Sequence, residues 1–355
     1  MSIEIKEIDD FDGDTIAVFI NRVFQDHYRG RSMVPQWTPA YLQWNIACSS
    51  GYHAFGAFKD GELVGFVMGL CQSYLHQGKR LEGVLASWLA VDTDRSSRLL
   101  SFKLIRRIFS STFDKTARCI KDVLLFYTDP ASGNAALWKR MAPQINARTI
   151  RKVGFLAKIF NAEKVIGAEW QPPRGHQILK LKHFCDIPEA ERLHGTMRPF
   201  EKKDIEECLV LINRPKSITA LSRIWGKEEL QNHLQHGSLA NSLLYRSNGT
   251  LHGIINYHLL DLIGRKTVQG AFVDFIYLQG LRLREEIQCI NQSLRYLKHL
   301  GCDIVLVPEN GIEKKLPLWL TGFVNAQRSM NLMISTEIER EITVKRNEKI
   351  LIECR

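Results

Sequence analysis

The chain has 355 residues, of which 45% are hydrophobic and 24% are charged, as is usual for globular proteins. At about 100–200 residues per domain, this length predicts two domains. No apolar run reaches the roughly 18 residues that a membrane-spanning helix needs, and the acidic N-terminal stretch lacks the apolar core of a signal peptide. We therefore expect a soluble, cytoplasmic protein without a membrane span.

The formal net charge of +10 is concentrated in one segment. Residues 95–158 hold 14 Lys and Arg but only 3 Asp and Glu, so the rest of the chain is close to neutral. Such a segment attracts phosphate groups or an acidic partner, unless it is simply a solvated helix face. No nucleic-acid recognition motif accompanies it, so we do not expect nucleic acid as a ligand.

The eight cysteines form no Cys-x-x-Cys pair, and several lie in apolar runs. This pattern favours buried thiols in a reducing compartment over disulfides or a structural zinc site. His233 and His236 are the one close histidine pair, at the end of a predicted helix. We expect no metal.

Strand and helix patterns alternate in the first part of the chain. Asp14 is the predicted N-cap of a helix with an apolar face, and Asp60-Gly61 between two apolar runs predicts a hairpin. The predicted elements are a strand at 3–8, helices beginning at 14 and 38, strands at 53–59, 62–70 and 85–91, a helix at 97–115, a strand at 123–128, a helix at 134–141 and a closing strand at 153–160.

A proline- and glycine-containing stretch at 171–196 predicts an inter-domain connection. The element order then repeats about 190 residues later, which indicates an internal repeat. We therefore predict domains at 1–170 and 197–334, followed by a charged tail with β-like alternation at 335–355. The predicted elements of the second domain are a strand at 197–200, helices at 204–212 and 226–235, strands at 243–245, 253–259 and 271–277, a helix at 284–300, a strand at 303–308 and a helix at 316–321.

This order of strands and helices resembles the GNAT acyltransferase superfamily, and its two-copy form is similar to the protein N-myristoyltransferases. Three stretches carry the resemblance: TMRPFEKKDIEE around Met197, LTGF at 320–323, and VDTDRSSRLLSFKLIRRI, which begins at Val91 where GNAT proteins place a pyrophosphate loop. The resemblance implies a mixed-sheet α/β fold of two tandem GNAT-like domains. It also implies transfer of an acyl group from acyl-CoA, or from an acyl carrier protein, to a small-molecule or peptide amine.

The predicted pyrophosphate loop leads from a buried strand into a helix N-terminus, where unpaired N–H groups and the helix dipole favour an anion. The usual small residues are only partly kept, because Leu99 replaces one of them; Arg95 and Arg98 can supply charge-assisted hydrogen bonds instead. An ordinary helix start with exposed arginines is the alternative. The residues expected to bind the cofactor are Leu89, Ala90, Val91, Arg95, Ser96, Ser97, Arg98, Leu99, Leu100, Ser101, Asn134 and Trp138.

The second copy differs at the corresponding helix start. Gly280 is present, but Glu285 and Glu286 follow it and would repel a pyrophosphate. We therefore expect the second copy to have lost cofactor binding and to shape the acceptor pocket or serve a structural role.

Acyl transfer to an amine needs a proton acceptor, an oxyanion donor and an acid for the leaving thiolate. Glu82 is the candidate base, because it precedes the long strand, although it can equally be an exposed strand-start glutamate. Trp138 occupies the position where many GNAT proteins carry an acidic Tyr, so Tyr127 is the candidate acid, with a core role as its alternative. N-myristoyltransferases use their C-terminal carboxylate as base, but about thirty residues follow Gly322-Phe323 here, so we do not transfer that role.

Two further groups are candidates for the pocket wall or for the core. Trp37, Tyr41 and Trp44 are spaced by four and three residues around the second helix, and the polar stretch 73–80 contains Tyr74 and His76. The alternative to an enzyme is a GNAT-fold module that binds a small ligand or a protein without chemistry, because the loop glycine and the last-helix Tyr are missing.

Overall fold

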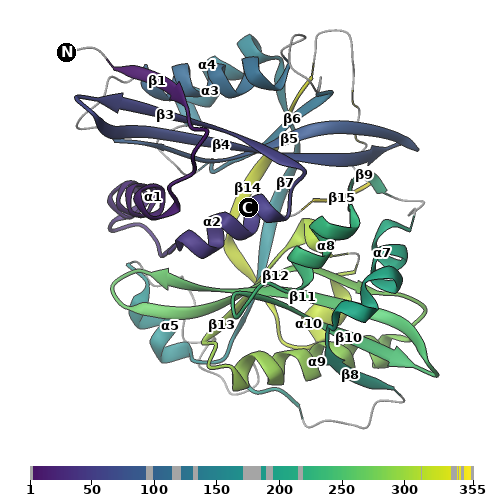
Figure 1. Ribbon diagram of the computed structural model, residues 1–355. Helices are drawn as coiled ribbons and strands as arrows, with labels where there is room; N and C mark the ends of the chain where they lie inside the picture. The colour runs from purple at the N-terminus through teal and green to yellow at the C-terminus, as the bar shows by residue number, and fades with distance from the viewer. Residues whose placement is uncertain are drawn as a thin grey trace.

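The computed structural model describes residues 3–92, 99–113, 121–130, 135–170, 185–188, 195–214, 219–312, 314–336, 342, 344 and 348–352. Within these ranges the chain forms two α/β halves, which Figure 1 shows one above the other. We call the elements up to α5 the first half and those from β8 onward the second half. None of the described helices is both long enough and apolar enough to cross a membrane.

The first half contains the elements that the periodicity predicts, together with a helix, α5, that it did not. They are β1 (Glu4–Glu7), α1 (Gly13–Tyr28), β2 (Val34–Pro35), α2 (Pro39–Ala47), β3 (Gly51–Lys59), β4 (Glu62–His76), β5 (Lys79–Val91), α3 (Leu100–Thr112), β6 (Val123–Thr128), α4 (Ala135–Met141), a 3-10 turn (Ala142–Ile145), β7 (Ala147–Ile159) and α5 (Ala162–Ala168).

The second half repeats this order and ends with one additional short strand. Its elements are β8 (Thr196–Pro199), a 3-10 turn (Lys202–Asp204), α7 (Ile205–Asn213), β9 (Thr219–Ile224), α8 (Lys227–Leu234), β10 (Ala240–Ser247), β11 (Thr250–Ile263), β12 (Thr267–Leu278), α9 (Leu283–His299), β13 (Ile304–Pro308), a 3-10 turn (Glu309–Gly311), α10 (Leu316–Leu320), β14 (Val324–Thr336) and β15 (Lys349–Leu351).

The described strands join into one mixed sheet in which the halves exchange strands. The order along the main path is β1-β3-β4-β5-β6-β14-β7-β13-β12-β11-β10-β8. Strand β14, which follows the last helix of the second half, therefore lies between β6 and β7, and β7 pairs with β13. Each half therefore contributes a strand that pairs within the other half. The inter-domain connection at 171–196 remains a prediction.

Helices cover both faces of each half. In the first half α3 packs on β3, β4 and β5, while α1 and α2 lie on the opposite face, toward the second half (Figure 1). In the second half α9 and α10 cover one face, and α8 meets α2 across the junction. Trp44 Nε1 donates to the Asn232 carbonyl at 2.9 Å, and Asn232 Nδ2 donates to the Ala47 carbonyl at 2.9 Å.

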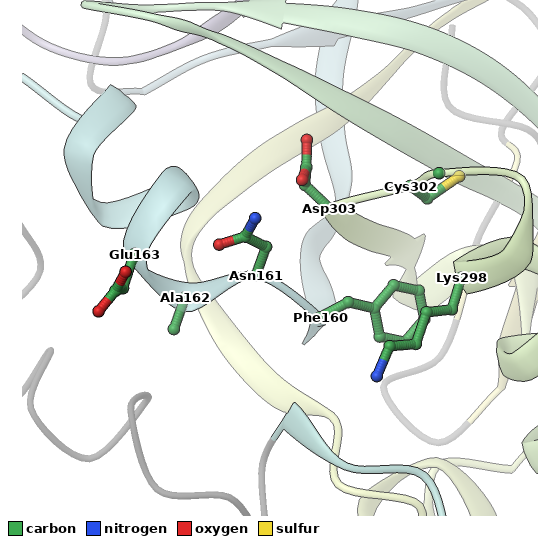
Figure 2. Close-up of a pocket in the computed structure, with 8 residues that line it drawn as sticks. Phe160, Asn161, Ala162, Glu163, Lys298, Cys302 and Asp303 are labelled. Carbon is green, nitrogen blue, oxygen red and sulfur yellow. The ribbon is translucent and has the colours of Figure 1, made fainter.

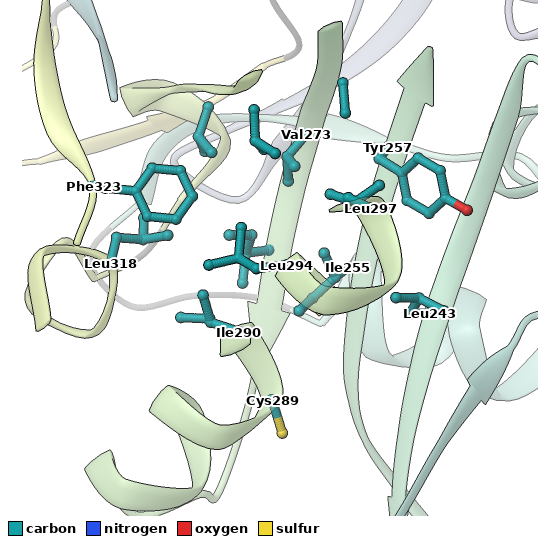
Figure 3. Close-up of a cluster of buried hydrophobic side chains, with 14 of the residues drawn as sticks. Leu243, Ile255, Tyr257, Val273, Cys289, Ile290, Leu294, Leu297, Leu318 and Phe323 are labelled. Atoms are coloured by element: carbon teal, nitrogen blue, oxygen red, sulfur yellow. The ribbon is translucent and has the colours of Figure 1, made fainter. Parts of the chain in front are cut away.

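The core of the second half shows why its long helix forms. Helix α9 presents Cys289, Ile290, Leu294 and Leu297 at a spacing of three and four residues, and each of these side chains is buried against the sheet (Figure 3). Burial raises the pKa of the Cys289 thiol to about 12, so this thiol remains protonated and behaves as a small apolar side chain.

Two local predictions are corrected. The N-cap of α1 is Asp12, not Asp14, because the Asp12 carboxylate accepts from the backbone N–H groups of Asp14 and Thr15. The polar stretch 73–80 is not a loop bordering a pocket, because it forms the ends of β4 and β5 around a turn at Gln77-Gly78. The end of β4 then pairs with β9 of the second half, which makes this hairpin part of the junction.

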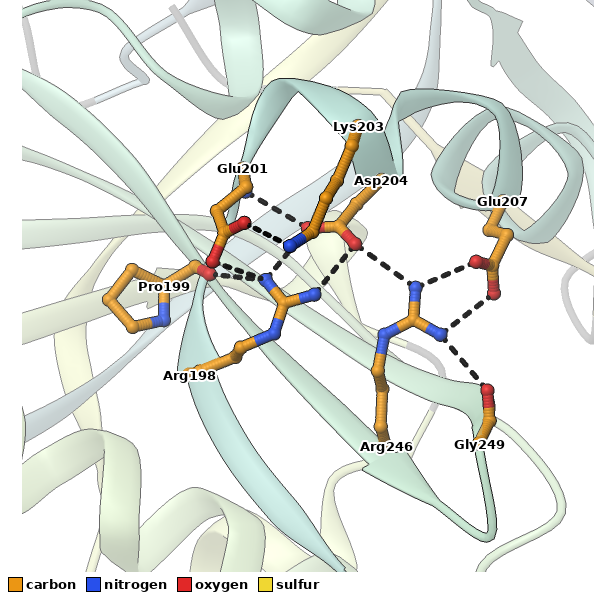
Figure 4. Close-up of polar contacts among 8 residues, drawn as sticks. All are labelled: Arg198, Pro199, Glu201, Lys203, Asp204, Glu207, Arg246 and Gly249. Carbon is orange, nitrogen blue, oxygen red and sulfur yellow. Dashed lines mark hydrogen bonds and ion pairs between the residues drawn. The ribbon is translucent and has the colours of Figure 1, made fainter.

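A charged network anchors the start of the second half (Figure 4). The Asp204 carboxylate is buried and accepts from Arg198 at 2.7 and 2.8 Å, from Arg246 at 3.1 Å and from the Glu201 backbone N–H at 3.0 Å. Arg246 also binds Glu207 at 2.8 Å. These bonds join β8, the turn before α7, α7 itself and β10. The buried negative charge of Asp204 is therefore balanced by two guanidinium groups.

Candidate functional site

The first half contains a place where two parallel strands separate. Strands β5 and β6 pair only from Gly83 and Val123 to Ala86 and Phe126, after which β5 continues to Val91 without β6 beside it. At the same point β5 carries a bulge, because Trp88 and Leu89 lie opposite the single residue Val67 of β4. On the side that β6 leaves, β5 therefore has no paired residue of β6 beyond Ala86.

Trp88 holds this bulge in an unusual conformation. Its φ of 53° lies in the left-handed region, which is disfavoured for a residue with a Cβ atom. Such a conformation persists when the surroundings fix it, and these outliers concentrate at functional sites. The Trp88 ring is buried and meets Tyr41 of α2 edge-on, with ring centroids 6.2 Å apart.

A cavity of about 430 Å³ lies at the carboxyl end of β5. In open α/β sheets this edge, outside the carboxyl ends of the strands, is where ligands bind. The side chains that line the cavity come from α1, from the end of β5 and from the start of α3: Arg22, Val23, Phe24, Asp26, His27, Tyr28, Leu89, Val91, Asp92 and Ser101.

Polar groups of the cavity are held by ion pairs and hydrogen bonds. Arg22 Nη1 lies 2.9 Å from Oδ2 of the buried Asp92, and the Tyr28 hydroxyl donates to Asp129 Oδ2 at 3.0 Å. Burial and the Asp129 charge raise the pKa of the Tyr28 phenol well above its usual value. Burial, followed by Arg31, lowers the pKa of His27, so this imidazole is neutral at pH 7.

The start of α3 borders this cavity through Ser101. No side chain of a described residue caps the helix, because its N-cap residue is Leu99. An uncapped N-terminus leaves N–H groups and a positive dipole end available for an anion. Leu99 is 64% exposed, whereas Leu100 is buried in the core, so of these two neighbours only Leu99 faces outward.

The other expected cofactor residues divide into three groups. Leu89 and Val91 line the cavity, while Ala90 is buried in the core that α1 and α2 cover. Trp138 stacks on Phe126 with centroids 4.8 Å apart and packs beside α3. Arg95, Ser96, Ser97, Arg98 and Asn134 lie outside the described residues.

The expected base, Glu82, lies away from the cavity and is not among the residues that line it. It lies seven residues before Leu89, or about 23 Å along an extended strand. Its carboxylate accepts from Arg80 Nε at 2.8 Å and from Ser73 Oγ at 2.9 Å at the far end of the hairpin. Glu82 therefore takes part in a surface ion pair away from the cavity, and its role as the base stays a prediction.

The expected acid, Tyr127, lies one residue beyond the last position of β6 that pairs with β5, and it pairs with Leu332 of β14. Its hydroxyl accepts from Asn310 Nδ2, which also donates to the Ile352 carbonyl. Tyr127 thus stands where the separating strands, the turn after β13 and the final described segment meet. Its role in proton transfer stays a prediction.

The aromatic group around α2 belongs mostly to the core. Tyr41 and Trp44 are buried and contact the second half, so they do not line the cavity. Trp37 precedes the helix, where its backbone N–H and carbonyl bind the Asn21 side chain at 2.9 and 2.7 Å. Its ring packs on Phe24, a cavity residue, with centroids 4.8 Å apart.

The second half has the same separation of two parallel strands, but a later segment of the chain occupies the space between them. Strands β12 and β13 pair parallel up to Phe272 and Leu306, and Asp274 is the extra residue of a bulge opposite β11. The chain after β13 then returns, so that Ile312 bridges to Ile276. A Cβ atom on Gly311 would lie 2.1 Å from the Asp274 carbonyl oxygen, so this close approach requires glycine.

Charge also closes the second half. Glu286 is buried at the start of α9 and binds Lys314 Nζ at 2.6 Å, while Glu285 accepts from the Arg282 backbone N–H at 2.9 Å as a helix cap. The groove between β12, α9 and α10 keeps only about 20 Å³ of free volume. These contacts occupy the start of α9 and the groove beside it, and the loss of cofactor binding in this copy stays a prediction.

A second, more open cavity of about 470 Å³ lies where α5 begins and α9 ends (Figure 2). The buried carboxylate in this cavity already has partners, because Asp303 Oδ2 binds Lys164 Nζ at 2.5 Å and the Gln269 N–H at 3.0 Å. It also lies at the amino end of β13, opposite to the edge at which ligands bind in such sheets. We therefore place the candidate site in the first half. Among the described residues, no group of three His, Cys, Asp or Glu side chains can hold a metal ion.

Sequence reasoning missed the α1 wall of the cavity, which contains Arg22, His27 and Tyr28, and the carboxylates Asp92 and Asp129 that bind it. The one signal that pointed to them was position, because Asp92 and Asp129 each directly follow a buried strand. Their partners on α1 are 70 and 101 residues away in sequence, and only folding brings them together.

No family model matches the sequence, and no curated protein sequence matches it. Solved structures do match. The chain is similar over 100% of its length to Saccharomyces cerevisiae N-myristoyltransferase with bound myristoyl-CoA, with a TM-score of 0.76, 14% identity and 86% of that chain covered. A structure of the same enzyme with myristoyl-CoA and inhibitors matches with a TM-score of 0.77 and 15% identity, and 87% of that chain is covered.

A conserved protein of unknown function from Enterococcus faecalis V583, described as a probable N-acyltransferase, is similar over 96% of this chain and 74% of its own, with a TM-score of 0.58 and 11% identity. At these identities the likeness shows the fold. The chain therefore has the tandem GNAT-like fold of the N-myristoyltransferase structures.

Proposed function

We propose that the protein is an N-acyltransferase that moves an acyl group from acyl-CoA to an amine, with its site in the first half. The observation that carries the proposal is the bulged end of β5, which separates from β6 beside a cavity of about 430 Å³. The equivalent separation in the second half is filled by the chain itself. The similarity to structures with bound myristoyl-CoA supports acyl-CoA as the donor.

The chemistry assigned to this geometry uses backbone groups first. A thioester placed along the separated edge of β5 can direct its carbonyl oxygen at N–H groups near Leu89–Val91, which would stabilise the oxyanion formed when the amine attacks. Attack of the neutral amine forms the C–N bond and the oxyanion, which then collapses to the amide as the C–S bond breaks. The proton that the nitrogen loses passes through solvent, or by way of Tyr127, to the departing thiolate. The leaving thiol has an ordinary pKa of about 8.5, so the thiolate departs without a strong acid, and Tyr127 is the candidate to protonate it.

The phosphate end of CoA would lie at the start of α3. No side chain among the described residues caps this helix start, and Arg95 and Arg98 precede the helix in sequence. The acceptor would enter from the side of α1, where the cavity wall holds Arg22 and its partner Asp92.

An acyl carrier protein is the second candidate donor, and one observation favours it. Helices α3 and α4 share one face of the sheet, and their exposed cations are Lys103, Arg106, Arg107, Lys139 and Arg140. An acidic carrier would dock there through several charges, so its binding would weaken steeply with salt, whereas binding of free acyl-CoA would weaken less.

Thermal unfolding with CoA, acetyl-CoA, myristoyl-CoA and an acylated carrier protein tests the proposal. A ligand at 100 times its dissociation constant should add about 2.7 kcal/mol of stability. Arg98→Glu should abolish the CoA-dependent rise in Tm, because it places negative charge beside the pyrophosphate. The matched control is Arg284→Glu, which makes the same change at the start of α9 and should leave the rise intact.

Two results would count against this reading. A response lost in Arg284→Glu and kept in Arg98→Glu would move the site to the second half. If the wild-type protein responds to none of the four donors, the non-catalytic binding module becomes the better description.

A further inference from the structure

A buried polar cluster lies at the bulge of the second half, at the position that corresponds to Trp88. Each of the two residues stands two places beyond the last parallel pair, Ala86 in β5 and Phe272 in β12. Asp274 is 2% exposed, and its Oδ2 lies 3.0 Å from His258 Nδ1 and 3.6 Å from His233 Nε2. A carboxylate can only accept hydrogen bonds, so His258 carries its proton on Nδ1.

Aromatic rings connect this cluster to the bulge of the first half. His258 packs against Tyr41 with centroids 5.4 Å apart, and Tyr41 packs edge-on against Trp88 at 6.2 Å. Beside them Trp44 contacts both imidazoles, at 5.3 Å from His233 and 5.1 Å from His258. Every side chain in this chain of contacts is at most 5% exposed.

The left-handed backbone at Trp88 needs a support of this kind. A residue with φ of 53° returns to extended backbone unless its side chain is locked by its neighbours. Tyr41 is one such neighbour, and its own position is fixed on the other side by His258. The ring of His258 is in turn oriented by its hydrogen bond to Asp274 and by stacking on Phe272 at 5.3 Å and 8°.

We propose that Asp274 is a positioning residue: through His258 and Tyr41 it fixes the bulge at Trp88, and so aims the backbone N–H groups at the end of β5 on the side that β6 leaves. The inference rests on the proposed function for what those N–H groups do, but its structural content does not. It gives the second half, whose own strand separation is filled, a part in arranging the site of the first half.

Hydrogen exchange of the free protein tests the structural content. Asp274→Ala should speed exchange of the amides at 88–91 by about tenfold, because local opening of the bulge becomes easier. Asp274→Asn keeps an acceptor for His258 and should restore exchange close to wild type. Glu286→Gln is the matched control, since it also alters a buried carboxylate of the second half but lies against α10, outside the ring contacts.

A second readout concerns the reaction. Asp274→Ala should retain the CoA-dependent rise in Tm, because the helix start of α3 is untouched, while kcat with myristoyl-CoA and an amine acceptor falls by about tenfold or more and KM for the donor changes little. If Asp274→Ala does not fold, His258→Phe keeps the ring, removes the hydrogen bond and should show the same faster exchange.

The outcomes separate the two claims. Exchange at 88–91 that is unchanged in a folded Asp274→Ala or His258→Phe protein, or that rises equally in Glu286→Gln, overturns the positioning role. A wild-type protein that binds no acyl donor contradicts the proposed function alone, and the exchange result then still decides whether Asp274 supports the bulge.

Discussion

The two halves follow one plan and differ where two parallel strands part. In each half a long strand carries a bulge two residues after its last parallel pair. In the first half the space beyond is a cavity, whereas in the second half it is filled by the turn that contains Gly311 and Ile312. Both halves thus share the bulge, so it is a feature of the common fold. Whether a cavity forms beside it depends on whether the segment after the neighbouring parallel strand fills the space.

The helix starts differ in the same sense. Helix α3 begins at Leu100, and among the described residues no side chain caps it, which suits an anion at this end. Helix α9 begins with Glu285 as its cap and Glu286 buried against Lys314, so its positive end is already occupied by carboxylates. A cofactor phosphate would have to displace both.

The largest expected effect tests the closure of the second half. Gly311→Ala places a Cβ atom 2.1 Å from the Asp274 carbonyl oxygen, so the turn has to move, and we expect about 3 kcal/mol lower stability in urea unfolding. Gly167→Ala is the control, because its Cβ atom would meet nothing within 4 Å. A CoA-dependent Tm rise that disappears in folded Gly311→Ala would contradict the assignment of the ligand to the first half.

A smaller loss of stability is expected from the charged network at the start of α7. The corresponding helix start of the first half, at α1, has only the exposed Asp12 cap. Asp204→Ala leaves Arg198 and Arg246 without their shared carboxylate, and we expect a loss of about 2 kcal/mol at pH 7 in urea unfolding. Asp12→Ala, the equivalent change at α1, should cost less, because it removes only an exposed helix cap. Equal losses would show that the two helix starts are energetically alike.

The pH dependence of this loss has a defined direction. Burial raises the pKa of Asp204, but its hydrogen bonds from Arg198 and from the Glu201 backbone outweigh burial, so the pKa is below its usual value in the folded protein. Its contribution is therefore complete above about pH 4, the unfolded pKa, and is lost as the pH falls through the folded pKa. The difference in free energy of unfolding between wild type and Asp204→Ala should therefore become smaller as the solution is made acidic.

The smallest effect is confined to the cavity of the first half. Burial and Arg31 lower the pKa of His27, so the unfolded chain binds its proton more readily than the folded one. Stability should fall as the pH drops below about 6.5, and His27→Gln should flatten this dependence by less than about 1 kcal/mol between pH 7.5 and 5.5. An identical slope in urea unfolding of both proteins would mean that this imidazole is not buried beside the cavity.

Local signals predicted most of the elements, because each depends on neighbours in sequence. Asp60-Gly61 forms a turn with positive φ at both residues, and Thr38 caps α2 with Pro39 at its first position. The helices α3 and α9 follow their apolar spacing. The prediction was wrong for 73–80, because those polar side chains form a strand whose partner, β9, lies some 145 residues away.

The amino-acid sequence by itself determined the element order, the repeat and the resemblance to a tandem GNAT fold, because periodicity, caps and turn residues act over a few positions. It did not determine that β14 enters between β6 and β7, that α1 forms a cavity wall with Asp92, or that Glu82 lies far from the bulge. Those outcomes depend on which distant surfaces bury one another, and only the tertiary structure decides them.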